Sequence, residues 1–150
     1  MDIVVAPGLA AIVRLGALVI EQTVNTVADA RLEAPLLASE AAVRAHPPEE
    51  SQAVRAMYRR IGLDPTKTRP SSEALLRRVR RGDELPRINS LVDVINWCSV
   101  ESQLPFGLYD LDRIRGTVTL RLGAPDERYV GIRKDTVHLT GRLTLADDEG

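Results

Sequence analysis

The segment Leu85–Asp112 (LPRINSLVDVINWCSVESQLPFGLYDLD) constrains the fold more than any other part of this chain. Asn89 or Ser90 can cap a helix there, because a short polar side chain accepts the first free backbone N–H groups. Apolar residues then recur at spacings of three and four and predict one buried helical face, made of Leu91, Val94, Ile95 and Cys98. Pro105 ends this helix, and residues 106–111 are predicted to form a strand.

A line of polar side chains runs along the same predicted helix at spacings of three: Asp93, Asn96 and Ser99. A helix with a polar line that turns sharply into a strand can form one wall of a pocket. Structural roles are open for two of these residues. Asn96 can be a buried amide that ties the helix to the backbone of the next strand, and Asp93 can bond to the loop around Arg87.

Two runs in this segment, Val92–Trp97 (VDVINW) and Leu104–Asp112 (LPFGLYDLD), resemble the editing domain of the phenylalanyl-tRNA synthetase β subunit. The family has VDVTNY and QPMHAFDLD at these places. The resemblance continues through Gly116–Arg121 and Leu145–Asp147, so it covers roughly Ser71 to the end. Free-standing relatives of that domain, including canavanyl-tRNA deacylase, are more similar still in RPSSEALLRR (69–78) and in GLYDLD.

Composition sets the bounds of the fold. A chain of 150 residues is one domain's length, and 44% hydrophobic with only 3% aromatic residues predicts a mostly aliphatic core. The single cysteine, Cys98, excludes an internal disulfide and fits a reducing compartment. The first twenty residues predict neither a signal peptide nor a membrane span, so we expect a cytoplasmic protein.

Other patterns predict helices early and strands late, hence an α+β fold with helices packed on a mixed or antiparallel sheet, as in the resembled editing domain. A buried strand is expected first, over Ile12–Gln22. A helical stretch is expected next, over 25–45, which Pro35 breaks into two pieces. Two more helices follow: one over 49–61 that Gly62 stops, and one over 71–81 that Ser71 caps and Gly82 ends. The later strands are expected at 117–122, 128–132 and 137–145, with turns at 123–126, 134–135 and 140–141.

The chain is expected to be a single editing-like domain over residues 1–150. The resembled family continues past the Ala146-Asp147 match into a glycine-rich turn and an acidic residue of its pocket, and this sequence ends before those positions. We therefore expect either a naturally short domain or one that lacks its C-terminal portion.

Charge is concentrated in one segment. Residues 59–87 hold nine basic side chains against four acidic ones, although the whole chain has a net charge of −1. Arginine suits bidentate phosphate contacts, so the segment can bind a phosphate backbone locally. The alternative is that Arg77–Arg81 simply line the negative end and the solvated face of a helix. The resemblance favours tRNA binding, with these candidates: Arg69, Arg77, Arg78, Arg80, Arg81 and Arg87.

The sequence indicates no metal site and no cofactor. Its two histidines, His46 and His138, are far apart, and Cys98 has no cysteine partner. No phosphate-cradling glycine pattern and no GxSxG elbow is found. Cys98 and Trp97 are expected to pack in the core, the latter with its N–H bonded, and His138 is a weak candidate for a base.

The resemblance implies hydrolysis of a wrong aminoacyl ester on the terminal adenosine of tRNA. A threonine–asparagine pair and a histidine line the pocket of that family; here Asn96 matches the asparagine, whereas Ile95 and Gly107 replace the other two. Gly107 leaves room for a longer amino-acid side chain. We expect Asn96 and Asp93 to be catalytic, and the substrate-binding residues to be Asn96, Ser99, Gly107 and Tyr109.

The leading hypothesis is thus a trans-editing aminoacyl-tRNA deacylase whose partner is the acceptor end of a charged tRNA. A non-catalytic module that binds tRNA or an amino acid, or a subunit of a larger assembly, is the alternative, favoured by the lost histidine. A structural domain that shares only the fold is a third possibility.

Overall fold

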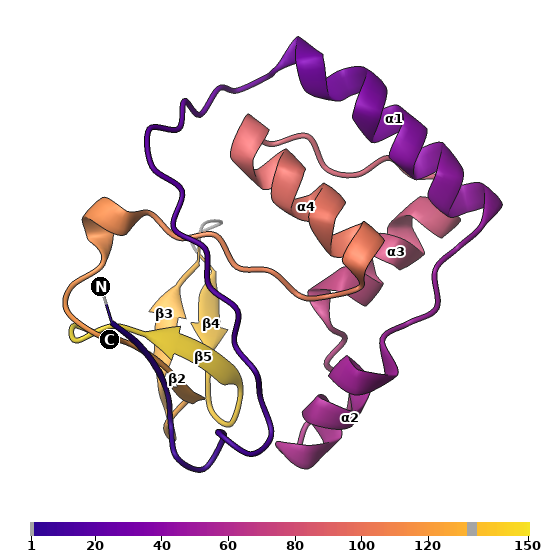
Figure 1. Cartoon of the computed structure of the whole chain (residues 1–150). Coiled ribbons are helices and arrows are strands. Elements are labelled where there is room, and N and C mark those ends of the chain that lie inside the picture. Colours follow the sequence, from indigo (N-terminus) through magenta and orange to yellow (C-terminus); the bar gives the residue numbers. More distant parts are fainter. Residues whose placement is uncertain (1, 132–134) are drawn as a thin grey trace. The chain divides into compact units, whose positions relative to one another are not determined.

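The computed structural model describes residues 2–131 and 135–150, which group into two compact units (Figure 1). The first, here called the sheet unit, consists of Met1–Ala17, Arg59–Leu63 and Tyr109–Gly150. The second, here called the helical unit, consists of Leu18–Tyr58 and Asp64–Leu108.

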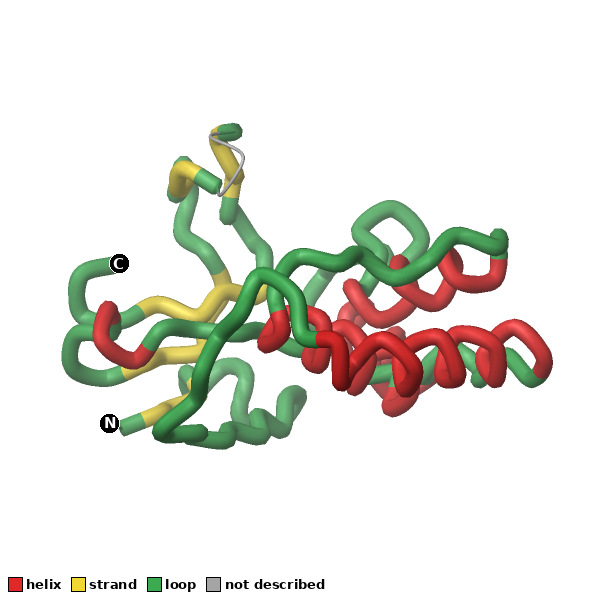
Figure 2. The backbone as a smooth tube through the Cα atoms, turned by 90° about the horizontal axis from the view of Figure 1, so that it is seen from above, coloured by secondary structure: helices red, strands yellow, loops and turns green. Residues whose placement is uncertain are grey.

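The sheet unit contains the β-strands, shown in yellow in Figure 2. β1 (Ile3–Val5) pairs in parallel with β2 (Val118–Leu122), and β2 pairs antiparallel with β5 (Leu143–Ala146). β3 (Arg128–Val130) and β4 (Thr136–His138) form a second, antiparallel pair. The predicted α+β class with a mixed sheet is therefore confirmed.

The helical unit is built from α1 (Ala30–Ala45), α2 (Gln52–Arg60, all but its last two residues), α3 (Ser71–Arg80) and α4 (Ser90–Ser102). Its core is aliphatic, as the composition predicts: Leu36, Val43, Leu76, Val79, Leu85 and Val100 are buried together. The fit between α1, α3 and α4 depends on these side chains, because each fully buried aliphatic residue stabilises the fold by roughly 1.5–3 kcal/mol.

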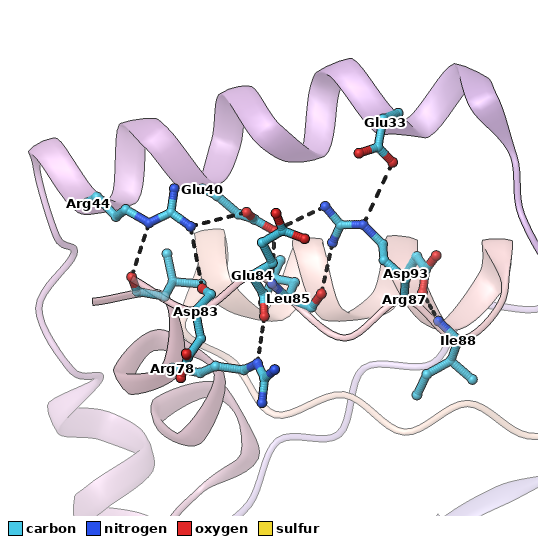
Figure 3. Close-up of polar contacts among 11 residues, drawn as sticks. Glu33, Glu40, Arg44, Arg78, Asp83, Glu84, Leu85, Arg87, Ile88 and Asp93 are labelled. Atoms are coloured by element: carbon cyan, nitrogen blue, oxygen red, sulfur yellow. Dashed lines mark hydrogen bonds and ion pairs between the residues drawn. The ribbon is translucent and has the colours of Figure 1, made fainter. Parts of the chain in front are cut away.

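A buried carboxylate joins α1 to the loop between α3 and α4 (Figure 3). The side chain of Glu40 is fully buried. Its Oε1 accepts a hydrogen bond from the Leu85 backbone N–H at 2.9 Å and forms an ion pair with Arg87 at 3.1 Å. Its Oε2 lies 3.3 Å from Arg44, which also donates to the carbonyls of Val79 and Asp83. One side chain thus holds the end of α3 and the approach to α4 against α1.

The predicted helix boundaries are confirmed where a cap or a glycine specifies them. Asn89 caps α4, since its side chain accepts the Val92 backbone N–H at 3.0 Å. Gly62 and Gly82 follow α2 and α3 with φ of 85° and 94°, a left-handed conformation that glycine adopts without a steric penalty.

Pro35 does not split the helix that contains it. α1 runs unbroken through Pro35, which removes only the bond to the carbonyl four residues before it, while burial of Leu36 and Glu40 holds the following turns in place. The helix also begins at Ala30 rather than at Asn25, because Asn25 and Thr26 bond instead to Ser90 of α4.

Two further helix starts differ from the prediction. α2 begins at Gln52 rather than at Glu49, and the Ser51 hydroxyl accepts the Val54 N–H at 3.3 Å there. Ser71 does not cap α3, because it is already the first helical residue and Pro70 occupies the cap position without a side-chain hydrogen bond.

The predicted strand over Ile12–Gln22 is wrong. The strand near the N-terminus is β1, whereas residues 13–21 have no regular secondary structure. Leu18, Val19 and Ile20 are exposed, so the apolar pattern of this segment does not mark a buried strand. Leu9 and Val13 are instead buried within a turn, where the Val13 N–H donates to the Leu9 carbonyl.

The predicted strand at 106–111 is also wrong. These residues are irregular up to a short 3-10 helix at Leu111–Arg113, where Asp110 accepts the Asp112 backbone N–H. The residues 137–145 form parts of two strands, β4 and β5, rather than one. In the predicted strand 128–132 and turn 134–135, Ile132 and Lys134 lie outside the described residues.

We predict that Glu40→Gln destabilises the fold by about 3 kcal/mol, because the substitution removes one charge from a buried ion pair and leaves Arg87 and Arg44 poorly compensated. Urea denaturation followed by circular dichroism measures this loss. Glu33→Gln is the matched control: Glu33 lies 4.0 Å from the same Arg87 but is 62% exposed, so the expected change is within about 0.5 kcal/mol. Equal losses in the two variants would contradict the central role of Glu40.

Candidate functional site

The polar line of α4 faces inward, contrary to the predicted orientation of this helix. Asp93 and Ser99 are 5% and 2% exposed. The apolar residues that were predicted to be buried are only half-buried, namely Leu91, Val94 and Ile95, and Cys98 is exposed. The prediction of Cys98 as a core residue is therefore wrong, because the inward side of α4 finds hydrogen-bond partners for polar side chains.

Asp93 bonds to the loop that precedes α4. Its Oδ1 accepts the backbone N–H of Ile88 at 2.8 Å (Figure 3). This contact is the structural role that the sequence left open for Asp93, a bond to the loop around Arg87. A carboxylate that is buried and engaged in this way supports the chain's path into α4, and its burial keeps it away from bulk water.

Ser99 fixes the other end of the helix. Its hydroxyl donates to the Leu104 carbonyl at 2.7 Å, just after Gln103 has turned the chain with a φ of 54°. The buried Gln103 side chain adds a bond to the Val100 carbonyl at 2.6 Å. Two of the three residues in the polar line therefore bond to backbone groups at the two ends of α4.

Asn96 lies between these two residues and differs from both. It is half-buried, and within the described part of the chain its side-chain amide forms no hydrogen bond. Its neighbour Trp97 packs against the core and donates its indole N–H to Glu101 at 2.6 Å, as predicted for a packing residue. Asn96 thus offers a donor and an acceptor that the local structure does not use.

Gly107 and Tyr109 are exposed, and neither lies in a strand. Gly107 belongs to the helical unit together with Asn96 and Ser99, whereas Tyr109 belongs to the sheet unit. Partial burial raises the pKa of the Tyr109 hydroxyl, and nearby Tyr129 raises it further. The substrate-binding role of these residues stays a prediction.

The predicted tRNA-binding arginines fall into two groups. Arg78 and Arg87 serve the fold: the first donates to the Glu84 carbonyl at 2.5 Å, and the second pairs with Glu40 and donates to the Leu85 carbonyl at 3.1 Å. The others are exposed and, in the part of the chain described, donate no side-chain hydrogen bond; we call Arg69, Arg77, Arg80 and Arg81 the arginine surface.

Two open hollows border the arginine surface. The first, of about 310 Å³, is lined by Arg69, Ala74, Arg77, Arg78, Arg81 and Asp83. The second, of about 400 Å³, is lined by Glu50, Arg69, Glu73, Leu76, Arg77, Arg80 and Arg81. The sequence analysis missed the two glutamates, because acidic residues at or just before the start of a helix are common without any function.

The described residues contain no group of three or more His, Cys, Asp or Glu side chains placed to hold a metal ion. Within the same ranges, no helix is both long and apolar enough to cross a membrane.

Comparison with known families decides the relationship. A family model described as the B3/4 domain matches residues 53–150. The chain belongs to the B3/4 domain family. The match includes α3, α4 and the arginine surface, and it confirms the resemblance found in the sequence.

Among curated proteins, the chain is similar to phenylalanine–tRNA ligase beta subunits. The subunit of Psychrobacter arcticus is 40% identical over 63 residues, which are 41% of this chain and 8% of that subunit. The subunit of Fusobacterium nucleatum is 33% identical over 84 residues, 55% of this chain and 10% of that subunit. The chain thus spans about a tenth of the length of these relatives, and no solved structure matches it.

We predict that Asp93→Ala destabilises the fold by about 1–3 kcal/mol, because the Ile88 N–H loses its acceptor. Asp93→Asn retains an acceptor oxygen and is expected to lose less than half as much. Urea denaturation of both variants measures the difference. An alanine variant that is as stable as the original chain would exclude the structural role and return Asp93 to the catalytic candidates.

Proposed function

We propose that this chain binds the acceptor end of a mischarged tRNA and hydrolyses the aminoacyl ester. Membership in the B3/4 family supports a tRNA partner, since the similar curated proteins are subunits of a tRNA ligase. The observation that carries the proposal is the arginine surface, which lies inside the matched residues and presents guanidinium groups that donate no side-chain hydrogen bond within the described chain. The proposed place of action is the cytoplasm.

The arginine surface supplies the phosphate contacts. Guanidinium groups bind phosphate oxygens through two parallel N–H bonds, and each contact releases counterions from the nucleic acid. Arg77 and Arg81 are one helical turn apart on α3 and line both hollows. Two adjacent phosphates of an RNA strand can therefore be held along this helix.

Hydrolysis of an aminoacyl ester needs few catalytic groups, because the ester is already activated. Orienting the ester and stabilising the developing oxyanion can suffice for hydrolysis. Asn96 is suited to this role, since its amide is a donor that no described residue uses. Gly107 adds no side chain that would compete for the space of the aminoacyl group. Asp93 and Ser99 then act by holding α4, not by contacting the ester.

A binding module without catalysis is the second candidate, either as a carrier of tRNA or an amino acid or as a subunit of a larger assembly. The bonds of Asp93 and Ser99 to the backbone favour it, because they give the carboxylate and the hydroxyl of the polar line structural roles. The two candidates share the arginine surface and differ only in whether the ester is cleaved.

For the arginine surface, we predict that Arg77→Ser combined with Arg81→Ser weakens tRNA binding and lowers the slope of log affinity against log salt by about 2, one for each lost phosphate contact. Filter binding at rising salt concentration measures both quantities.

Arg113→Ser is the control, because Arg113 is 86% exposed and belongs to the sheet unit, outside the arginine surface. This variant is expected to retain the original slope. A slope that is the same in all variants would refute phosphate binding by Arg77 and Arg81.

For the ester, we predict that Asn96→Ala lowers the rate of deacylation about a hundredfold, as loss of one oxyanion donor does, with tRNA affinity changed by less than about twofold. A panel of misacylated tRNAs, with release of the labelled amino acid as the readout, measures the rate.

Cys98→Ser is the matched control, since Cys98 is an exposed residue two positions further along α4. It is expected to deacylate at the original rate. If the unaltered chain releases no amino acid faster than buffer does but still binds tRNA, the non-catalytic module is the correct function.

A further inference from the structure

Glu73 has a carboxylate oxygen that the fold does not use. The residue is 3% exposed, and its Oε2 accepts a hydrogen bond from Arg55 at 2.8 Å. Its Oε1 is buried and has no hydrogen-bond partner among the described residues. Leaving a buried carboxylate oxygen without a hydrogen-bond donor destabilises a protein, so a ligand that supplies a donor is favoured here.

The surroundings of Glu73 show which donor suits it. Burial raises the pKa of the Glu73 carboxyl, nearby Glu50 raises it further, and Arg55 and Arg69 oppose the shift. The Arg55 guanidinium is shared, because it also bonds to Glu50 at 2.8 Å. Oε1 is thus an acceptor with incomplete compensation, which a ligand N–H would satisfy.

Glu73 also lines the second hollow, and most of the other residues that line this hollow are positively charged. Arg69, Arg77, Arg80 and Arg81 line it together with Glu50 and Glu73. Arg77 and Arg80 stand about 6 and 10 Å beyond Glu73 along the axis of α3, at 1.5 Å per residue. A fitting ligand therefore has an N–H donor at one end and an anion at the other.

We propose that the second hollow binds one nucleotide of an RNA strand, with its phosphate on the arginines and an exocyclic amino group of its base on Oε1 of Glu73. The proposal rests on the proposed function, which supplies RNA as the source of the nucleotide. It adds base selection to a surface that would otherwise read only phosphate charge.

Net charge and size select a nucleotide over a free amino acid. The four arginines and two glutamates of the lining leave two positive charges, which an anionic phosphate compensates and a neutral zwitterion does not. A volume of about 400 Å³ lies within the usual range of sites for nucleotide-sized ligands. Unstacked RNA bases are read at their edges, where carboxylates accept from exocyclic amino groups.

Uridine is the nucleoside that this hollow is expected to bind most weakly. Cytidine, adenosine and guanosine carry an exocyclic amino group, whereas the imide N–H of uridine lies between two carbonyl oxygens that would face the Glu73 carboxylate. The expected preference is about tenfold, which corresponds to about 1.4 kcal/mol, the order of a single hydrogen bond.

The test is an NMR titration of the full chain with CMP, AMP, GMP and UMP, with ribose 5-phosphate as the base-free control. CMP, AMP and GMP should bind about tenfold more tightly than UMP, and ribose 5-phosphate should bind no better than UMP. Competition by short cytidine and uridine oligonucleotides should show the same order, because RNA is the proposed source.

Glu73→Gln sharpens the test, because its amide oxygen can stay on Arg55 while its NH₂ group replaces the acceptor toward the base. The preference for CMP and AMP over UMP should then disappear or reverse. Glu49→Gln, an exposed neighbour of Glu50 that does not line the hollow, should keep the preference. Thermal unfolding of both variants verifies that they are folded. If Glu73→Gln does not fold, the relative affinities of the original chain for CMP, AMP, GMP and UMP decide the proposal.

Two outcomes separate this proposal from the proposed function. Equal binding of CMP and UMP by a chain that still binds tRNA would overturn base selection and leave the tRNA function intact. A clear preference for amino-bearing nucleotides without any binding of oligonucleotides or tRNA would support the hollow as a nucleotide site and overturn the RNA source together with the proposed function.

Discussion

The buried carboxylate of Glu40 is the interaction on which the helical unit depends. One carboxylate oxygen accepts the Leu85 N–H and forms an ion pair with Arg87, and the other pairs with Arg44. Burial of an ion pair is weak evidence for stability, since desolvation offsets most of the attraction, but it specifies one arrangement well. Here it specifies how the chain leaves α3 and enters α4, because the loop cannot shift without leaving Glu40 uncompensated.

That arrangement also decides which arginines remain available for a ligand. Leu76 and Val79 are fixed inward by the core, so the positions between and beyond them on α3 are directed outward. Arg78 and Arg87 are taken by carbonyl groups of the loop and by Glu40. Thus the positive segment that the sequence showed as one block is divided by the fold into a structural group and the arginine surface.

Sequence reasoning succeeded where a local rule suffices. The Asn89 cap, the glycine stops after α2 and α3, the aliphatic core and the family resemblance depend on short stretches of chain.

Sequence reasoning failed where the structure of a segment depends on partners far away in the sequence. The Ile12–Gln22 pattern suits a strand, but a strand needs a partner strand to pair with, and these residues pair with none of the described strands. Periodicity likewise cannot distinguish a polar residue that forms hydrogen bonds in the interior from one that faces solvent. For this reason Cys98 and the buried face of α4 were predicted wrongly.

The hydrogen bonds of the polar line of α4 indicate a positioning role for two of its residues. Asp93 bonds to the backbone before the helix and Ser99 to the backbone after it, so the two residues fix the ends of the segment that contains Asn96. A reacting group must be held within a fraction of an ångström to be effective, and groups on rigid elements are held better than groups on loops. Two of the three polar residues therefore contribute to the proposed chemistry as positioning residues, and the third, whose amide forms no hydrogen bond with the described residues, is the one that we propose to contact the ester.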